Sequence, residues 1–269
     1  MIYWYSDLTS VVKWNDVNSF SFTVGSGVRQ GVLSPHLFAI YVNDLILTLR
    51  KLNVGCHVID IFLASIIYAD DICLMAPCRS SLQILLNACE SYGLSWCLSY
   101  NPSKSRIMQF GKNVVKTEFT MYGNLLEFVN EYKYLGVFVV AGKQFSTSHT
   151  SPLIKFRSAA NTVLNAHSKP SEDVLMKLLY AKCVPIMTYS CESISYSTKQ
   201  FNSLNVAMNN CIRRIFGYNR WESVRFLRLS MGYPSITDIF YRRRERFLQN
   251  IPLIGNPTLH SLINVTKEA

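Results

Sequence analysis

Two adjacent carboxylates, Asp70 and Asp71, stand between two apolar segments of the chain. Segments 61–69 and 72–76 are typical of strands, and a tight turn between them would expose both side chains on a rigid support. Hard divalent cations such as Mg²⁺ prefer carboxylate oxygens, and phosphoryl-transfer sites hold two such ions about 4 Å apart. That chemistry needs carboxylates from at least two strands. An Asp-Asp pair taken alone is most often a solvated turn.

A motif about forty residues upstream gives this pair its context. Residues 27–35 read Gly-Val-Arg-Gln-Gly-Val-Leu-Ser-Pro, and residues 68–71 read Tyr-Ala-Asp-Asp. Together and in this order they resemble the reverse transcriptases of LINE-like, non-LTR retrotransposons, which are RNA-directed DNA polymerases. A viral RNA-directed RNA polymerase fits less well, because this pairing of motifs is the one that reverse transcriptases carry.

Further segments agree with the same family. Trp4-Tyr5-Ser6 and residues 12–15 resemble the stretch just before the upstream motif, and residues 101–105, Asn-Pro-Ser-Lys-Ser, resemble the next palm motif. Residues 134–137 resemble the primer-grip hairpin, and residues 182–185 resemble the helical thumb. The resemblance covers most of the chain and is strongest over residues 27–137.

The resemblance implies a role for each matching position. Asp70 would be the principal metal ligand and Asp71 would assist in ligation or local electrostatics, with Mg²⁺ or Mn²⁺ as the ion of a complete site. Lys104 would lie near the triphosphate, where it could donate a proton to the leaving pyrophosphate. The residues against nucleotide and template would be Arg29, Gln30, Gly31, Tyr68 and Ala69, and the primer grip would be Tyr134, Leu135 and Gly136.

Several of these positions also have a plainer structural interpretation. Ser34 and Pro35 fit the start of a helix, because a proline in the first turn loses no hydrogen bond. Lys104 taken alone would be a surface lysine, and Tyr134 and Leu135 taken alone would be core residues. Only the ordered set of motifs favours the catalytic interpretation over these alternatives.

The net charge of +10 is concentrated in the second half of the chain. Residues 1–150 carry 11 Lys and Arg against 10 Asp and Glu, whereas residues 151–269 carry 16 against 7. This excess favours a polyanionic partner, with nucleic acid first and an acidic membrane surface second, while a solvated basic face is the plainer alternative. Two clusters could contact a nucleic-acid backbone: Arg213 with Arg214, and Arg242 with Arg243 and Arg244.

The composition predicts a globular, intracellular protein. Hydrophobic residues make up 49% and charged residues 16% of the chain. The eight cysteines include no C-x-x-C pair, which favours buried free thiols in a reducing compartment. The N-terminus lacks the pattern of a signal peptide, and the apolar stretch 58–69 is too short to span a membrane. We expect a cytoplasmic or nuclear location and no membrane partner.

The hydrophobic periodicity predicts an α+β region followed by helices. A strand is expected over 20–24, a helix over 37–49, and a helix from a capping box at Ser80 and Gln83 to about residue 98. Further strands are expected over 106–110, 118–121, 125–129 and 134–140, and helices over 153–167, 172–190, 198–216, 222–230 and 235–250.

These elements define the expected architecture. The fold class is α+β: a partial polymerase palm, with an antiparallel sheet and packed helices, followed by an all-helical, thumb-like domain. The partial palm would comprise residues 1–145, a linker residues 146–152, the basic thumb-like domain residues 153–250, and a C-terminal tail residues 251–269.

In this family the first catalytic carboxylate lies on a palm strand before the Trp-Tyr-Ser segment, at which this chain begins. Asp7 and Asp16 are the only acids before Gln30, and both fit turn positions. We therefore expect a fragment of a retrotransposon reverse transcriptase that is inactive alone. Its full-length relative would extend a DNA primer on an RNA template with dNTPs. A non-catalytic RNA- or DNA-binding module and an inert transposon relic are the alternatives.

Overall fold

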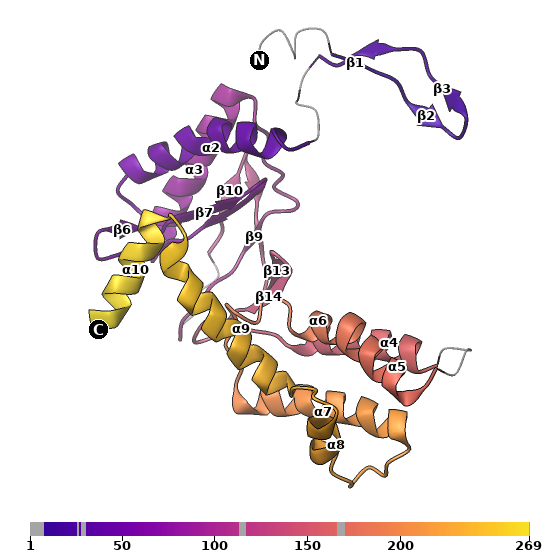
Figure 1. Cartoon of the computed structure of the whole chain (residues 1–269). Coiled ribbons are helices and arrows are strands. Elements are labelled where there is room, and N and C mark those ends of the chain that lie inside the picture. The colour runs from indigo at the N-terminus through magenta and orange to yellow at the C-terminus, as the bar shows by residue number, and fades with distance from the viewer. Residues whose placement is uncertain (1–7, 26, 28–30, 113–116, 166–169, 269) are drawn as a thin grey trace. The chain divides into compact units, whose positions relative to one another are not determined.

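The computed structural model describes residues 8–25, 27, 31–112, 117–165 and 170–268, with side chains to residue 264. They form two compact units (Figure 1). Each unit has its own hydrophobic core. The first unit comprises residues up to 100 together with 120–122, and the second comprises residues 101–119 and 123–269. Helices and small sheets occur together, so the predicted mixed α+β class is confirmed.

Two helices and several short strands make up the first unit. Helices α2 (Ser34–Lys51) and α3 (Arg79–Trp96) pack against each other. Two antiparallel hairpins join them, β5–β6 (His57–Val58, Ile61–Phe62) and β7–β8 (Ser65–Tyr68, Asp71–Leu74). The helices present apolar residues at helical spacing to this core, which contains Val42, Leu45, Leu49, Phe62, Ala64, Leu85, Cys89 and Tyr92.

Residues 8–24 form a two-stranded ribbon with mostly exposed side chains. Strand β1 (Thr9–Ser10) pairs with β4 (Phe22–Thr23), and β2 (Lys13–Trp14) pairs with β3 (Val17–Asn18). The strand expected over 20–24 is therefore present in part, as β4. Asp16 lies in the turn between β2 and β3, as its sequence context predicted.

The start of α3 differs from the prediction. The expected capping box of Ser80 and Gln83 is wrong, because the helix begins at Arg79 and its N-cap is Cys78. The Gln83 side chain donates to the carbonyl of Thr120 at 2.9 Å and accepts from the amide N–H of Thr120 at 3.2 Å. Gln83 therefore holds strand β10 (Thr120–Met121) against the helix instead of closing the helix end.

The second unit contains two small sheets. Strand β9 (Arg106–Ile107) runs parallel to β12 (Glu127–Phe128). Strand β12 follows β11 (Asn124–Leu125) directly in the sequence. Strand β14 (Val137–Val140) lies between β13 (Glu131–Tyr134) and β15 (Ser146–Thr147), antiparallel to both. The single strand predicted over 134–140 is wrong, because Leu135 and Gly136 have φ angles of +46° and +85° and reverse the chain there.

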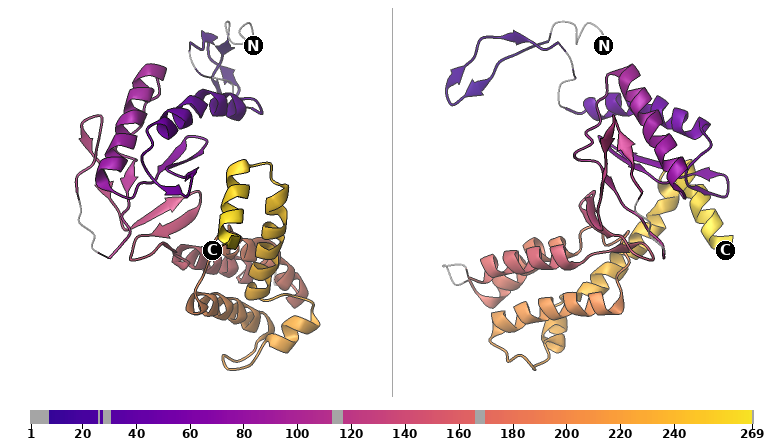
Figure 2. Two further views of the ribbon diagram at one scale, coloured as in Figure 1. Left: turned by 90° about the vertical axis from the view of Figure 1, so that its left-hand side faces the viewer. Right: turned by 180° about the vertical axis from the view of Figure 1, so that it is seen from behind.

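A helical core occupies the rest of the second unit, and Figure 2 shows α4 (Thr150–Leu164) beside α7 (Thr198–Phe216). The other helices are α5 (Glu172–Leu178), α6 (Val184–Met187), α8 (Arg225–Ser230), α9 (Ile236–Asn250), the 3-10 turn η2 (Ile251–Leu253) and α10 (Pro257–Glu268). The predicted helix over 198–216 is confirmed residue for residue. Segment 146–152, expected as a linker, holds β15 and the first residues of α4.

The helix predicted over 172–190 is interrupted by a π turn, η1 (Leu179–Cys183). The N–H of Val184 donates to the carbonyl of Leu179, five residues back. Pro185 follows directly and has no N–H, and its ring would clash with a carbonyl four residues earlier in a regular α-helix. The wider turn accommodates the proline without ending the helical path.

Serine side chains cap two helices of the second unit. Ser197 and Gln200 form a reciprocal capping box at the start of α7, and Ser235 and Asp238 form one at the start of α9. The hydrogen bonds from Ser235 lower the pKa of the Asp238 carboxyl. These caps fix where both helices begin.

All eight cysteines are free thiols, and four of them are buried. The predicted buried thiols are therefore found in part, since Cys78 and Cys97 are exposed. Burial raises the pKa of the Cys89 thiol to about 12, whereas hydrogen bonds with Ser80 and Ser81 lower the pKa of Cys78 to about 7.

Within the described ranges, no helix has the length and apolar character needed to cross a membrane.

Candidate active site

The carboxylate pair lies at the tip of the β7–β8 hairpin. Tyr68 is paired with Asp71 across the two strands, so only Ala69 and Asp70 form the turn. Both carboxylates are exposed. The prediction that a tight turn presents this pair to solvent is confirmed.

The two faces of the hairpin differ. Ile67 and Ile72 are cross-strand neighbours, and both pack against the core of the first unit. The opposite face carries Ile66, Tyr68 and Cys73, with Ile66 47% and Tyr68 64% exposed. Partial burial raises the pKa of the Cys73 thiol, which keeps it neutral. The inner face thus anchors the strands while Tyr68 and the carboxylates remain accessible.

Ala69 has a φ of +50°, a value that favours glycine. A residue with a Cβ in this region costs about 1–2 kcal/mol. Such strain persists only where the surrounding structure enforces it, and here the paired strands on both sides do so. The turn therefore stores strain beside the carboxylate pair.

The donor set of the tip fits a divalent cation. Mg²⁺ is commonly bound through one or two carboxylates, with water and substrate phosphates as the remaining ligands. Asp70 and Asp71 supply the two carboxylates. Across the part of the chain that the structure describes, no group of three or more His, Cys, Asp or Glu side chains could hold a metal ion. The tip offers a partial ligand set that a phosphate-bearing ligand would complete.

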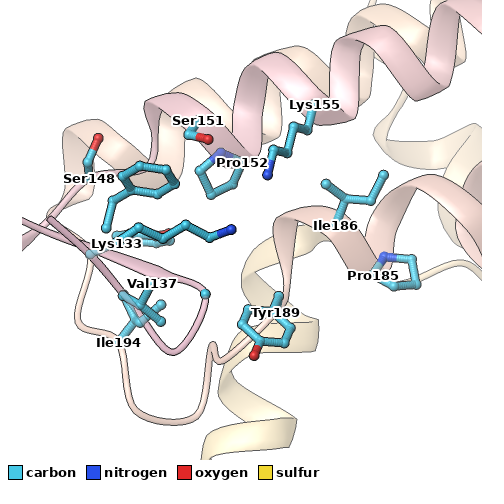
Figure 3. Close-up of a pocket in the computed structure, with 13 residues that line it drawn as sticks. Lys133, Val137, Ser148, Ser151, Pro152, Lys155, Pro185, Ile186, Tyr189 and Ile194 are labelled. Carbon is cyan, nitrogen blue, oxygen red and sulfur yellow. The ribbon is translucent and has the colours of Figure 1, made fainter. Parts of the chain in front are cut away.

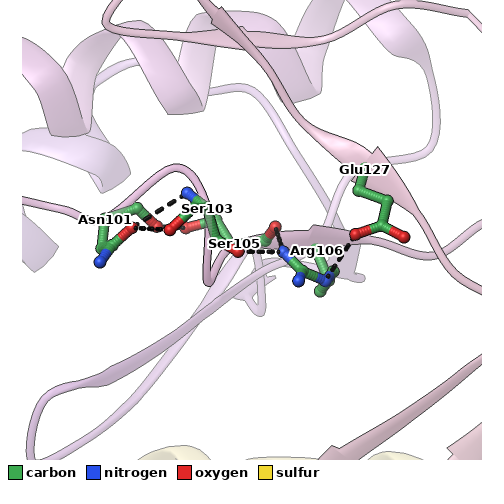
Figure 4. A network of polar contacts seen from close by, with 5 residues as sticks. All are labelled: Asn101, Ser103, Ser105, Arg106 and Glu127. Carbon is green, nitrogen blue, oxygen red and sulfur yellow. Dashed lines mark hydrogen bonds and ion pairs between the residues drawn. The ribbon is translucent and has the colours of Figure 1, made fainter.

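Lys104 lies in a second turn, in the other unit. The Asn101 side-chain oxygen accepts from the Ser103 amide at 3.0 Å and from its hydroxyl at 2.7 Å (Figure 4). The Arg106 guanidinium donates to the carbonyl of Ser103 at 2.6 Å and pairs with Glu127 at 3.3 Å. This network fixes the backbone on both sides of the exposed Lys104 side chain.

The three predicted primer-grip residues occupy the end of the β13–β14 hairpin. Tyr134 is paired with Val137, and Leu135 and Gly136 form the turn. Tyr189, just after α6, donates its hydroxyl to the Leu135 carbonyl at 3.1 Å. A Cβ built on Gly136 would lie 2.7 Å from the Tyr189 ring. Tyr189 thus clamps the turn, a role that sequence reasoning missed because its partner is 54 residues away.

Of the three upstream residues that are predicted to lie against nucleotide and template, the structure describes one. Arg29 and Gln30 lie outside the described residues. Gly31 is exposed, and its N–H and carbonyl are both within hydrogen-bond distance of the Ser34 hydroxyl, at 3.3 Å and 3.0 Å. Gly31 therefore leads directly into α2.

The arginines of α7 are engaged within the second unit. Arg213 donates to the Glu222 carbonyl at 2.8 Å, and Arg214 donates to the Asn161 side chain at 2.7 Å. The second bond ties α7 to α4. Both guanidinium groups therefore have a structural role in this state.

The arginines of α9 differ from one another. Arg243 donates to Glu192 at 2.7 Å and to the carbonyl and hydroxyl of Thr188 at 3.1 Å. Arg244 makes one longer bond, 3.3 Å, to the Ser195 hydroxyl. Arg242 is exposed, and within the described ranges no hydrogen bond or ion pair engages its guanidinium group. Only Arg242 of these three is free to contact another molecule without first breaking a bond.

Comparison with known proteins gives two matches. The family described as "Reverse transcriptase (RNA-dependent DNA polymerase)" matches residues 2–139, a span that includes the carboxylate tip, Lys104 and the β13–β14 turn. The "RNA-directed DNA polymerase from mobile element jockey" of Drosophila funebris is 27% identical over 228 residues. The alignment covers 80% of this chain and 24% of that protein, so the chain spans about a quarter of the relative's length.

Ala69→Gly should stabilise the first unit by about 0.5–1 kcal/mol. The substitution removes the left-handed strain, and the greater freedom of glycine in the unfolded chain offsets part of the gain. Urea denaturation followed by circular dichroism measures the change. Ala88→Gly, inside α3, is the matched control and should cost about 1 kcal/mol. A loss of stability in both variants would contradict the strain at Ala69.

Gly136→Ala should destabilise the second unit by about 1–3 kcal/mol, because the new Cβ would collide with the Tyr189 ring. In a Tyr189→Ala background the same substitution should cost clearly less. Gly123→Ala is the control, since Gly123 also has a positive φ but a Cβ added there would meet no atom within 4 Å. Equal costs in both backgrounds, measured by urea denaturation, would rule out the clamp.

Arg243→Ala should lower stability by about 1–2 kcal/mol, since it leaves Glu192 and Thr188 without their donor. Water screens part of this interaction, because the Arg243–Glu192 pair is partly exposed. Arg242→Ala makes the same charge change one residue away and should alter stability by less than about 0.5 kcal/mol. Thermal unfolding of both variants checks the difference, and matching melting curves would contradict it.

Proposed function

Since the chain belongs to the reverse transcriptase (RNA-dependent DNA polymerase) family, we propose that it forms part of the site at which DNA is copied from RNA. Its substrates in that role are an RNA template, a DNA primer and dNTPs. The first unit and the strands of the second correspond to a polymerase palm, and the basic helices correspond to a thumb. The chain spans 24% of the relative's length. We therefore propose a contribution of this chain to the activity of a longer enzyme.

The observation that carries the proposal is the exposed pair Asp70–Asp71 at the end of a rigid hairpin. A bound Mg²⁺ or Mn²⁺ would neutralise charge on the triphosphate and on the oxygens that exchange partners. Asp70 and Asp71 would hold that ion from one side. The anchoring of Ile67 and Ile72 in the core keeps the two carboxylates from moving apart when the ion and substrate bind.

Two other features support binding of the substrates. Lys104 is an exposed cation on a turn braced by hydrogen bonds, which suits it to a triphosphate. The β13–β14 turn is held in one shape by Tyr189, which suits it to the primer end. A constrained turn loses little entropy when a strand binds against it.

The basic second half supports contact with the nucleic-acid backbone. Residues 151–269 carry 16 Lys and Arg against 7 Asp and Glu. The exposed and unengaged Arg242 is the favoured contact of α9, whereas Arg213, Arg214 and Arg243 already bind within the unit. Such contacts are independent of sequence and weaken with salt. The alternative function, a non-catalytic nucleic-acid-binding module, would use the same basic surface. The two functions differ only in whether the carboxylate tip takes part.

A primer-extension experiment separates these two functions. The purified chain is given an RNA template with an annealed DNA primer, labelled dNTP and Mg²⁺. The sequence predicts that this chain alone does not extend the primer, so binding of the dNTP in the presence and absence of Mg²⁺ is measured as well. Mg²⁺-dependent binding of the dNTP should weaken at least about tenfold in Asp70→Asn, and any incorporation should be lost, because a metal ligand is removed. Affinity for the template–primer, measured by fluorescence anisotropy, should stay unchanged. Affinity should fall steeply between about 50 and 200 mM salt.

Asp60→Asn is the matched control for that experiment. Asp60 is also exposed and also follows a residue of positive φ, Ile59, in the turn of β5–β6. It removes the same charge from the same unit and should leave Mg²⁺-dependent binding of the dNTP unchanged. Mg²⁺-dependent dNTP binding that is equal in Asp70→Asn and the unmodified chain would refute the polymerase role. Binding of the template–primer without any Asp70-dependent binding of the dNTP would favour the binding module.

A further inference from the structure

The second unit contains a cavity of about 400 Å³ between the β13–β14 hairpin and helices α4 and α6 (Figure 3). This size lies within the range of sites for small organic ligands. The predicted site residues contribute only Gly136 to its lining. The cavity therefore adjoins the predicted primer-grip turn through Gly136 and Tyr189, and it contains none of the residues that the proposed function assigns to the metal ion or the triphosphate.

Two lysines enter the cavity from different elements. Lys133 lies across from Phe138 in the β13–β14 pair, so both side chains leave the same face of the hairpin. Lys155 lies on α4, whose core-facing residues are Leu153, Phe156 and Ala160. Figure 3 shows both ammonium groups directed into the same space.

The charge of this space is unbalanced. The lining includes Lys133 and Lys155 and no aspartate or glutamate. Within the described part of the chain, neither lysine has an ion-pair partner. Two ammonium groups that face one cavity repel each other, and an anion between them would turn that repulsion into attraction. The cavity therefore selects for a negatively charged ligand.

The walls select for more than charge. Pro185, Ile186 and Tyr189 form an apolar side next to the lysines, and Val137 continues it on the hairpin (Figure 3). A bare inorganic anion would leave this surface uncovered. A flat ring would cover it, because rings pack well against proline, tyrosine and branched side chains. The cavity thus fits an anion that carries a planar, partly apolar body.

We propose that this cavity binds a nucleotide unit, with its phosphate between Lys133 and Lys155 and its base against Pro185, Ile186 and Tyr189. The choice of a nucleotide among planar anions rests on the proposed function, whereas the preference for a planar anion rests on the cavity alone. The unit is either a free nucleotide or part of a strand, since both offer the same chemistry.

Occupancy of the cavity acts on the neighbouring turn. Tyr189 lines the cavity and also donates to the Leu135 carbonyl. A base packed on one face of the Tyr189 ring restricts its motion and so holds the Leu135–Gly136 turn more firmly. A ligand here stabilises the hairpin that the proposed function assigns to the primer.

Binding of deoxyadenosine monophosphate to the purified chain, followed by titration calorimetry, tests the proposal. The probe should bind the unmodified chain, while deoxyadenosine and inorganic phosphate should each bind at least about tenfold more weakly. Lys133→Gln and Lys155→Gln should each reduce affinity about tenfold. Lys143→Gln removes an exposed lysine of the same unit that does not line the cavity, and it should have no effect.

A further variant tests whether the ligand lies against the apolar side of the cavity. Ile186→Trp fills the apolar side of the cavity and should abolish binding, with circular dichroism and melting confirming that the unit stays folded. A single-stranded oligonucleotide is the second probe. If it binds in a way that depends on both lysines while the free nucleotide does not bind, the site is assigned to a nucleotide within a strand, and the proposal is supported. Unchanged binding in a variant that carries both Lys133→Gln and Lys155→Gln, or no binding of either probe, overturns the proposal.

The outcome is distinguishable from failure of the polymerase role. Asp70→Asn should leave binding at the cavity unchanged, because Asp70 belongs to the other unit and does not line it. Naphthalene sulfonate serves as a planar anion without a phosphate. If it binds with the same lysine dependence and the same affinity as the nucleotide, the nucleotide assignment is overturned.

Discussion

A two-residue reversal between paired strands is the constraint on which the site depends. It recurs at Asn15–Asp16, Ile59–Asp60, Ala69–Asp70 and Leu135–Gly136, and the first residue of each turn has a φ between +46° and +54°. In the first three an aspartate follows, a residue that tolerates turns well. What distinguishes Asp70 is therefore the adjacent Asp71, which begins β8 and brings a second carboxylate to the same tip.

Local patterns predicted the carboxylate tip and the long helix α7 because both depend on neighbours in the chain. Two mainly apolar runs with a short polar interruption suffice for a hairpin, and helical spacing suffices for 198–216. The errors arose where a distant partner decides. Gln83 fits a capping box, but Thr120 offers it two hydrogen bonds. Residues 134–140 form one continuous apolar run that is typical of a single strand, yet Tyr189 stabilises a turn within them.

The arginine clusters show the same limit for function. Arg242, Arg243 and Arg244 are equivalent in sequence, and a cluster of this kind suggests a phosphate-binding surface. The fold distinguishes them, because of the three only Arg243 donates hydrogen bonds to Glu192 and Thr188. A guanidinium group that already holds three acceptor atoms on two residues must lose them before it can bind a phosphate. The charge that remains available is smaller than the sequence count indicates.

The family match ends at residue 139, within β14, while Tyr189 lies 50 residues further along the chain. The turn expected to hold the primer is thus encoded in the matched region, but its shape is maintained by a residue outside that region. Helices α4 and α6 also close one side of the cavity next to that turn. The geometry of the hairpin therefore depends on the helical half, and a chain cut at the end of the match would keep the Leu135–Gly136 turn without its clamp.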